Sequence, residues 1–334
     1  MEKIIASIAV IAALVLVGFG AWHFTSSPTT YSGDPEPITI GLTPYEYSGL
    51  IYIAEDQGYF AGSGLNATVL DYNTTLQAID GLLNDETDVA LTSEYVLLGK
   101  AFQKENLSVI GNVDKYQSVY LIGRKDREIE DLTDLKGKRI GLTRGTIGEF
   151  YLGRFLDLHG VSIQDVTLVD MPPSQYVQAL TNGSVDALVA VNKIADQIQE
   201  RLGSNVVLWS AQSSQPAYYV MACRNDWAYT HPEQIKRLLK SLDLAEKYAI
   251  NHPAQAKAIV QRKLNLTDAY TATVWPNHQY SLSLDQSLIL AMEDEGRWMI
   301  KNNLTSEKTI PDFRKYIYAK DLEEVNPEAV NIIS

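Results

Sequence analysis

The segment GKRIGLTRGTIGEFYLGRFL, residues 137–156, contains the pattern of a strand, a turn and a helix in direct succession. Apolar residues alternate through KRIGLT, which is typical of a strand, and the residues after the turn are apolar at helical spacing. The turn itself, RGTIG, consists mostly of small residues. In an open α/β sheet such a turn lies beyond the carboxyl end of its strand, where ligands bind. The segment therefore predicts an α/β fold with a ligand-contacting turn.

Strand-like and helix-like segments alternate on both sides of this segment. They form one unit over residues 38–113 and a second over residues 138–210. Such alternation predicts a mostly parallel sheet with helices on its faces. The expected strands are 38–43, 65–72, 88–92, 107–113, 138–143, 166–171, 185–191 and 205–210, and the expected helices include 48–60, 74–86, 93–105, 173–183 and 193–203.

Two similar segments border the second unit. VYLIGRKD, residues 119–126, and YVMACRND, residues 219–226, both run from apolar residues through a small residue into Arg-x-Asp. We interpret them as paired hinge strands that join two lobes, with a helical C-terminal part packed on the first lobe. The cleft between the lobes is then the expected ligand site. The predicted boundaries are 38–120 and 224–334 for the first lobe and 121–223 for the second.

The N-terminal residues 1–24 contain an almost wholly apolar run. The run is long enough to span a bilayer as a helix. No good small-x-small cleavage site follows it, so we favour an uncleaved membrane anchor over a signal peptide. The polar residues 25–37 are expected to form a linker. We therefore expect a protein anchored to the membrane by this segment, or secreted, with its lobes outside the cytoplasm.

The bulk composition argues against several classes of protein. A formal net charge of -13 argues against binding to nucleic acid. The single cysteine, Cys223, excludes an internal disulfide, and the five histidines show no metal-ligand spacing. No phosphate-binding glycine motif is present, so we expect neither a nucleotide cofactor nor any other. No heptad stripe suggests a coiled coil, and we expect a monomer.

Five turns are expected to face the cleft, because each follows the carboxyl end of a strand. Hydroxyl, carboxyl, amide and aromatic side chains are frequent in them. The residues expected to contact the ligand are Tyr45, Glu46, Tyr47, Ser48, Ser93, Glu94, Tyr116, Gln117, Gly145, Thr146, Ile147 and Asn192.

Two classes of ligand remain open at these turns. The helix N-terminus after Gly145 favours an anion or a carbonyl oxygen. The glutamates Glu46, Glu94 and Glu149, with tyrosines that can stack on a ring, would instead favour a cation, a zwitterion or an amine. Alternatively, Glu94 and Glu149 only stabilise the first turns of their own helices.

Three segments carry a resemblance to a known family. They are GLIYIAEDQGYFAGSGLNATV at residues 49–69, DLKGKRIGLTRGTIGEFYLGRFLDLHGV at residues 134–161, and ALTNGSVDALVAVNKIADQI at residues 179–198. Together they resemble the signature segments of the NMT1/THI5-like and SsuA-like solute-binding proteins of ABC transporters. The resemblance covers about residues 36–230. It implies a type II periplasmic-binding-protein fold with two α/β lobes.

The resemblance also implies a function. Members of this group deliver nitrate, sulfonates, taurine, bicarbonate or thiamine-pyrimidine precursors to an ABC transporter permease. It implies ligand contacts from Tyr45 to Ser48, from Ser93 and from Gly145 to Ile147. Where many members carry an acidic residue and a proline, this chain has Val191, Asn192 and Lys193, so the small organic or anionic ligand is not identified.

Two alternatives to a transport protein are a THI5-like enzyme that makes the thiamine pyrimidine and a ligand-sensing receptor lobe. The enzymes of the group use a cysteine-rich run, whereas this chain has only Cys223. We therefore expect no enzymatic activity. A receptor lobe would need a signalling partner, and no signalling domain is visible in the sequence.

Six N-x-S/T sequons predict glycans on an extracytoplasmic protein. If glycans are attached, the intact mass of protein purified from its native cells should exceed the mass of the unmodified chain. Replacing each asparagine by glutamine should remove the excess step by step. A native mass equal to that of the bare chain would contradict the prediction. The sequons begin at Asn66, Asn73, Asn106, Asn182, Asn265 and Asn303.

Overall fold

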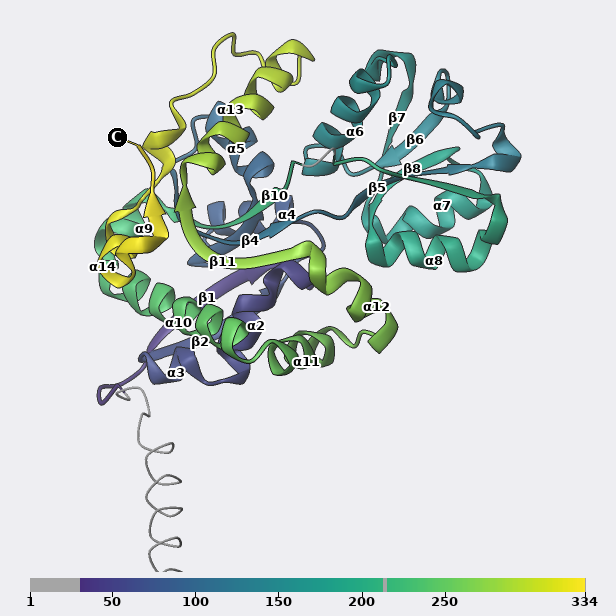
Figure 1. Ribbon diagram of the computed structural model, residues 1–334. Coiled ribbons are helices and arrows are strands. Elements are labelled where there is room, and N and C mark those ends of the chain that lie inside the picture. Colours follow the sequence, from purple (N-terminus) through teal and green to yellow (C-terminus); the bar gives the residue numbers. More distant parts are fainter. Residues whose placement is uncertain (1–30, 213–214, 334) are drawn as a thin grey trace, which may run out of the picture.

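The structure is a computed structural model that describes residues 31–212 and 215–333 (Figure 1). The expected anchor at residues 1–24 and the first part of the expected linker lie outside these ranges. Within the two ranges, no helix is both long and apolar enough to cross a membrane.

The larger sheet forms the centre of the first lobe (Figure 1). In the described residues it has seven strands in the order β12-β11-β4-β10-β3-β1-β2. Strands β1, β2 and β3 are parallel to one another, as the alternation predicts, whereas β10 is antiparallel to its neighbours β3 and β4. The strands are β1 (Glu36–Leu42), β2 (Leu65–Asp71), β3 (Val89–Ser93), β4 (Leu107–Tyr116), β10 (Ala217–Arg224), β11 (His278–Asp285) and β12 (Val330–Asn331).

The smaller sheet forms the second lobe. Among the residues that the structure describes, it has five strands in the order β7-β6-β8-β5-β9. Strand β6 is parallel to β7 and β8, and β5 is antiparallel to β8 and β9. The strands are β5 (Val119–Arg124), β6 (Arg139–Leu142), β7 (Thr167–Asp170), β8 (Ala187–Val191) and β9 (Val206–Ser210).

Helices cover both sheets. The second lobe carries α6 (Ile147–Leu158), α7 (Tyr176–Asn182) and α8 (Asn192–Leu202). The first lobe carries α2 (Gly49–Asp56), α3 (Tyr59–Gly62), α4 (Thr75–Leu83), α5 (Glu94–Phe102), α9 (Asn225–Thr230), α10 (Pro232–Asn251), α11 (Pro253–Leu264), α12 (Asp268–Val274), α13 (Gln286–Lys301) and α14 (Lys320–Val325).

The strand, turn and helix expected at residues 137–156 are present as β6, a turn and α6. Gly145 has a φ of +71°, a left-handed conformation in which a side chain would be strained. This glycine turns the chain sharply enough for α6 to begin directly above the end of β6.

The two segments interpreted as hinge strands lie in different sheets. Strand β5 belongs to the second lobe, but β10 pairs along its whole length within the first. The chain therefore leaves the first lobe between Tyr116 and Val119 and returns between Ser210 and Ala217. The similarity of the two sequences thus reflects two ordinary buried strands, and the return crossing precedes the second of them.

The C-terminal part was expected to be helical, but it also contains a strand. HQYSLSLD, residues 278–285, forms β11 and extends the large sheet beyond β4. Its alternation of polar and apolar residues is a strand pattern. The prediction missed it because the flanking segments are strongly helical.

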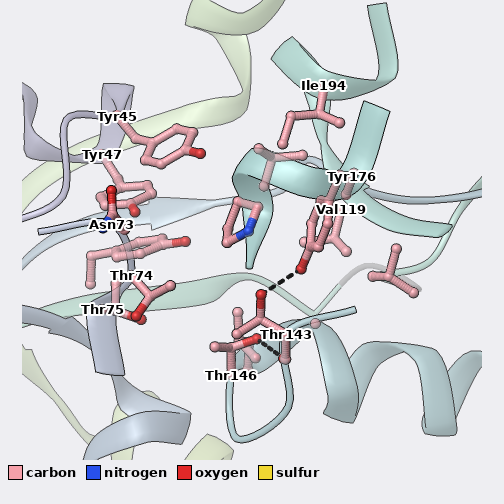
Figure 2. A pocket seen from close by; sticks show the side chains of 17 residues that line it. Tyr45, Tyr47, Asn73, Thr74, Thr75, Val119, Thr143, Thr146, Tyr176 and Ile194 are labelled. Carbon is pink, nitrogen blue, oxygen red and sulfur yellow. Dashed lines mark hydrogen bonds between the residues drawn. The ribbon is translucent and has the colours of Figure 1, made fainter. Parts of the chain in front are cut away.

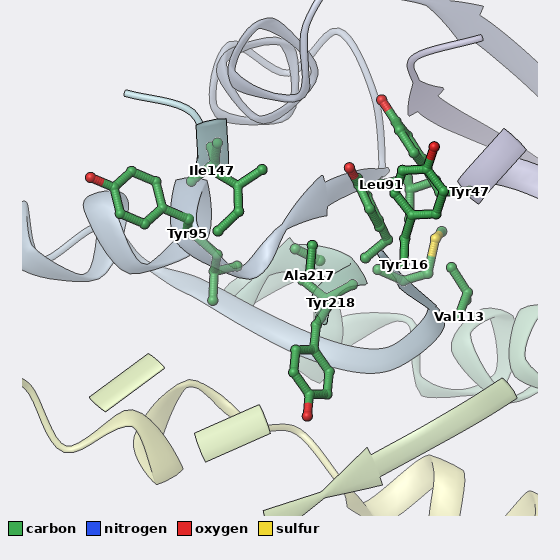
Figure 3. Packing of buried hydrophobic residues seen from close by; sticks show 14 of the residues in the cluster. Tyr47, Leu91, Tyr95, Val113, Tyr116, Ile147, Ala217 and Tyr218 are labelled. Carbon is green, nitrogen blue, oxygen red and sulfur yellow. The ribbon is translucent and has the colours of Figure 1, made fainter. Parts of the chain in front are cut away.

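A continuous apolar core crosses from one lobe to the other, and Figure 3 shows part of it around Tyr95, Ile147 and Tyr218. Helix α6 carries this contact, since its Phe150 meets Trp298 of α13 edge to face, with ring centroids 5.5 Å apart. Gly153 lets the helices approach closely, because a Cβ there would lie 2.1 Å from the Trp298 ring. Helix α6 is therefore packed against the first lobe although its strand belongs to the second.

Gln212 joins the two chain segments that connect the lobes. Its side-chain oxygen accepts hydrogen bonds from the amides of Ser118 and Val119, the latter at 2.8 Å. Its side-chain nitrogen donates to the carbonyl of Tyr116, also at 2.8 Å. The residue is only 3% exposed. One buried side-chain amide on the segment that returns to the first lobe thus binds three backbone groups of the segment that leaves it.

Replacing Gln212 by alanine should lower the free energy of unfolding by about 1–3 kcal/mol, because the three backbone groups would lose their buried partner. Urea unfolding followed by tryptophan fluorescence measures the change. Gln178→Ala, at an exposed position on α7, is the control and should change the free energy by less than about 0.5 kcal/mol. An equally small effect of both substitutions would show that Gln212 does not hold the crossing together.

Candidate ligand cleft

A cleft lies between the two lobes, and we call it the inner cleft (Figure 2). Both lobes provide its walls, so that a solute inside it would contact the two lobes at once. The first lobe contributes Tyr45, Tyr47, Asn73, Thr74, Thr75 and Tyr219. The second lobe contributes Val119, Thr143, Thr146, Ile147, Gly148, Pro173, Tyr176, Val189, Ala190, Val191 and Ile194.

Stacked tyrosines form the wall on the first lobe. The rings of Tyr47 and Tyr219 are nearly parallel, with centroids 3.7 Å apart, and Tyr45 stacks on Tyr47 at 5.6 Å. The Tyr47 hydroxyl is hydrogen-bonded to that of Thr43, whereas the Tyr219 hydroxyl has no partner in the described part of the chain. Burial raises the pKa of Tyr47 and Tyr219, so that both hydroxyls keep their protons. This wall offers aromatic faces and a free hydroxyl.

The N-terminus of α4 meets the cleft beside these tyrosines. The hydroxyl of Thr74 accepts a hydrogen bond from the Gln77 amide at 3.1 Å and so caps the helix. Thr75 is only 8% exposed, yet its hydroxyl has no partner among the described residues. A buried hydroxyl that lines a cleft without a partner is available to a ligand.

The N-terminus of α6 forms the facing wall on the second lobe. The Thr146 hydroxyl donates to the Thr143 carbonyl at 2.7 Å instead of capping the helix. The Thr143 and Tyr176 hydroxyls share a hydrogen bond of 2.7 Å (Figure 2). Within the described ranges, no partner binds the amides of Ile147 and Gly148, which both line the cleft. These amides and the helix dipole favour an anionic or carbonyl oxygen at this point.

The inner cleft has no charged lining. None of the described residues that line it is Asp, Glu, Lys, Arg or His. A cation would lose its hydration there without gaining a carboxylate. An oxyanion could instead bind the free amides of α6. The lining therefore suits a neutral solute or one with a single anionic group.

The three glutamates that could have recognised a cation lie elsewhere. Glu149 accepts hydrogen bonds from the Gly145 amide at 2.8 Å and from Arg144 at 3.0 Å. Glu94 accepts one from the Tyr218 amide at 2.8 Å. Glu46 is buried, and its carbonyl accepts from the Tyr280 hydroxyl at 2.7 Å. Each carboxylate is thus placed in the protein interior rather than in the cleft wall.

Four of the residues expected to contact a ligand line the inner cleft, namely Tyr45, Tyr47, Thr146 and Ile147. The other expected residues lie outside the lining. The Ser48 hydroxyl donates to the Thr43 carbonyl at 2.9 Å, and the Ser93 hydroxyl caps α5. The ones outside the lining are Glu46, Ser48, Ser93, Glu94, Tyr116, Gln117, Gly145 and Asn192.

Two of these outlying residues are buried outside the lining. Tyr116 is buried behind Tyr219, at a ring distance of 6.5 Å, and stacks on His278. Asn192 is buried at the start of α8. Tyr116 therefore affects the cleft only through Tyr219 in front of it.

Sequence reasoning missed the turn at Asn73, Thr74 and Thr75. A usable signal existed, because this turn also follows the carboxyl end of a parallel strand, β2. Tyr219 had no such signal, since it lies within an antiparallel strand and reaches the cleft only through its pairing with β3 and β4.

Comparison with known proteins identifies the family. The family model described as NMT1/THI5 like matches residues 46–256. The chain belongs to the NMT1/THI5-like family. A putative binding protein of Brucella abortus (strain 2308) is 25% identical over 260 residues, which are 75% of this chain and 78% of that relative.

The fold of this NMT1/THI5-like chain is also similar to that of solved structures. The alkanesulfonate-binding protein SsuA from Xanthomonas axonopodis pv. citri, solved with MOPS bound, superposes with a TM-score of 0.74 at 15% identity, over 86% of this chain and 100% of that one. The expected type II periplasmic-binding-protein fold is thereby confirmed. The chain is also similar to an enzyme. A 4-amino-5-hydroxymethyl-2-methylpyrimidine phosphate synthase of Aspergillus parasiticus is 22% identical to it, over 64% of this chain and 66% of the synthase.

In this NMT1/THI5-like chain, Glu94 and Glu295 form a buried carboxyl pair beside the contact between α6 and the first lobe. Both are 0% exposed, and neither forms an ion pair with a described residue. Burial raises the pKa of Glu94 to about 8. Burial and the neighbouring Glu94 raise the pKa of Glu295 well above its usual range. The pair therefore holds a proton at neutral pH that the unfolded chain would release.

Because the native state binds this proton more tightly, raising the pH from about 5 to about 8 should lower the free energy of unfolding, by at most about 1.4 kcal/mol per pH unit for one proton. Glu94→Gln, which cannot ionise, should reduce this slope and raise the unfolding temperature at pH 8. Thermal unfolding at a series of pH values measures both. Glu323→Gln, at an exposed position of α14, is the control. A Glu94→Gln slope equal to that of the wild type would contradict the assignment.

Proposed function

We propose that this protein is an extracytoplasmic solute-binding protein that captures a small solute in the inner cleft and delivers it to an ABC importer. The observation that carries the proposal is a cleft whose two walls come from different lobes. Such a cleft binds its solute fully only when the lobes are closed on it, so the solute shifts the population towards the closed form. The importer permease would then recognise the closed form.

The lining supports a particular class of solute. The free amides of Ile147 and Gly148 would bind an oxyanion or a carbonyl oxygen, and the hydroxyls of Thr75 and Tyr219 can add hydrogen bonds. The stacked tyrosines would pack on the apolar or aromatic body of the solute. An alkyl or aryl sulfonate or carboxylate fits this lining better than an amine does, because the cleft has no carboxylate for a cation.

The proposed location rests on the sequence. The apolar residues 1–24 would anchor the protein to the membrane or act as a signal peptide, and the protein would act as a monomer. All six sequon asparagines lie in the described part of the chain and are exposed there. Their exposure is compatible with glycans but is also the usual state of a surface asparagine.

A pyrimidine-synthesising enzyme is the less favoured alternative. Catalysis of that kind would need reactive groups in the cleft, and the described lining of the inner cleft contains none that titrates near neutral pH. Cys223 is 0% exposed on β10, and burial raises the pKa of its thiol to about 12, so that it is a poor nucleophile. A ligand-sensing lobe would share the cleft and would differ only in its partner.

Ligand binding should raise the unfolding temperature of the purified protein. A solute at about 100 times its Kd adds about 2.7 kcal/mol, which corresponds to roughly 5 to 10 °C for lobes of this size. The panel includes methanesulfonate, benzenesulfonate, taurine, nitrate, bicarbonate, aminopyrimidines and simple amines. A sulfonate should give the largest shift and should also make the particle more compact in solution scattering. A shift with amines alone, or no shift with any compound, would reject the proposal.

Substitutions in the cleft test which atoms bind the solute. Gly148→Asp would place a carboxylate beside the free amides of α6 and should abolish sulfonate binding. Thr75→Val removes only a hydroxyl and should weaken binding by about tenfold. Thr133→Val, at an exposed position outside the cleft, is the matched control and should bind normally. Normal binding by Gly148→Asp would show that the solute does not lie at α6.

A further inference from the structure

The inner cleft continues outward into a second space, which we call the outer cleft. The two parts share Tyr45, Asn73, Pro173 and Ile194, so that a solute can extend from one into the other. The labelled Tyr45, Asn73 and Ile194 lie around the cleft in Figure 2. The outer cleft is lined by Pro44, Tyr45, Tyr72, Asn73, Pro173, Ser174, Lys193, Ile194 and Gln197.

Lys193 distinguishes the outer cleft from the inner one. It is the one charged side chain among the described residues that line either part. It is half-buried, and it forms no ion pair within 4 Å with any residue that the structure describes. It also lines a neighbouring groove together with Asp196 and Glu200 of the same helix, but neither carboxylate pairs with it. Its ammonium is therefore available to an anionic group of a solute in the outer cleft.

The start of α8 adds hydrogen-bond donors at the same place. Lys193 is the second residue of α8, where the helix dipole already makes the potential positive. No side chain caps this helix, and its first turn contains no acidic residue. An ammonium and a helix N-terminus thus coincide at the outer cleft, and Lys193 forms no ion pair with a carboxylate of the described residues.

We propose that Lys193 and the start of α8 form an outer subsite for an acidic group of the solute. This inference rests on the proposed function and specifies its ligand. The solute would have two acidic groups, one at the amides of α6 in the inner cleft and one at Lys193. Its apolar or aromatic body would lie between them against the tyrosines. Lysine suits a carboxylate, sulfonate or phosphate equally, because it acts as a compact point charge with three rotatable donors.

Lobe closure would strengthen this contact. Lys193 belongs to the second lobe, whereas Tyr72 and Asn73 across the outer cleft belong to the first. Closing the lobes would remove water around the ammonium and its anion, and their attraction rises as the local dielectric constant falls. A second acidic group would therefore favour the closed form as well as the bound one. Lys193 would thus determine the preference for solutes with two acidic groups over solutes with one.

Two pairs of compounds test the subsite: ethanesulfonate against sulfoacetate, and benzenesulfonate against 4-sulfobenzoate. In sulfoacetate a carboxylate replaces the methyl group of ethanesulfonate, and in 4-sulfobenzoate a carboxylate replaces one ring hydrogen of benzenesulfonate. Isothermal titration of the full-length protein should show that at least one dianion binds about tenfold more tightly than its monoanion. Lys193→Met should abolish this preference and leave monoanion binding within about twofold. Lys193→Arg should restore it, and added salt should weaken it.

Lys257→Met is the matched control, because Lys257 is also half-buried and without an ion pair but lies on α11, outside both parts of the cleft. It should keep the wild-type preference. Equal binding of both members of each pair by the wild type, or an equal loss of both in Lys193→Met, would overturn the subsite and leave the proposed function standing. If no compound of either pair binds the wild type, the subsite is overturned, and the wider panel of the unfolding experiment decides the proposed function.

Discussion

The buried side chain of Gln212 is the connection on which the two-lobed arrangement depends. It binds the outgoing segment at Tyr116, Ser118 and Val119 while itself lying on the returning segment. Strand β5 begins at Val119, so the same amide fixes the position of the first strand of the second lobe. Helix α6 adds a second connection through Phe150 and Trp298, and these two contacts together define how the walls of the cleft face each other.

The absence of charge from the described lining of the inner cleft decides which solutes it suits. Polar recognition there depends on hydroxyls and on backbone amides, which are fixed by the fold and need no counter-ion. Two buried carboxylates near the cleft accept hydrogen bonds from the protein itself, Glu149 from Gly145 and Arg144, and Glu94 from Tyr218. These carboxylates therefore stabilise the structure around the cleft. The groups available to bind a solute are instead the hydroxyls and the amides at the helix N-termini.

The sequence predicted the α/β alternation and the importance of the turn at Gly145, because both follow from local patterns. It predicted Tyr45, Tyr47, Thr146 and Ile147 at the cleft for the same reason. It did not reveal where the side chains of Glu94 and Tyr219 would lie, since their surroundings depend on neighbours far away in the chain. The hinge strands were misplaced because an apolar strand that crosses between sheets has the same composition as one that stays within a sheet.

The burial of Cys223 has a practical consequence for measuring lobe movement. Its thiol is 0% exposed, and burial raises its pKa to about 12, so that it stays protonated at neutral pH. It is also the only cysteine of the chain. Thiol-reactive dyes or spin labels will therefore leave it unmodified in the folded protein. Two cysteines introduced on the surface, one on each lobe, can report the distance between the lobes without removal of the native residue.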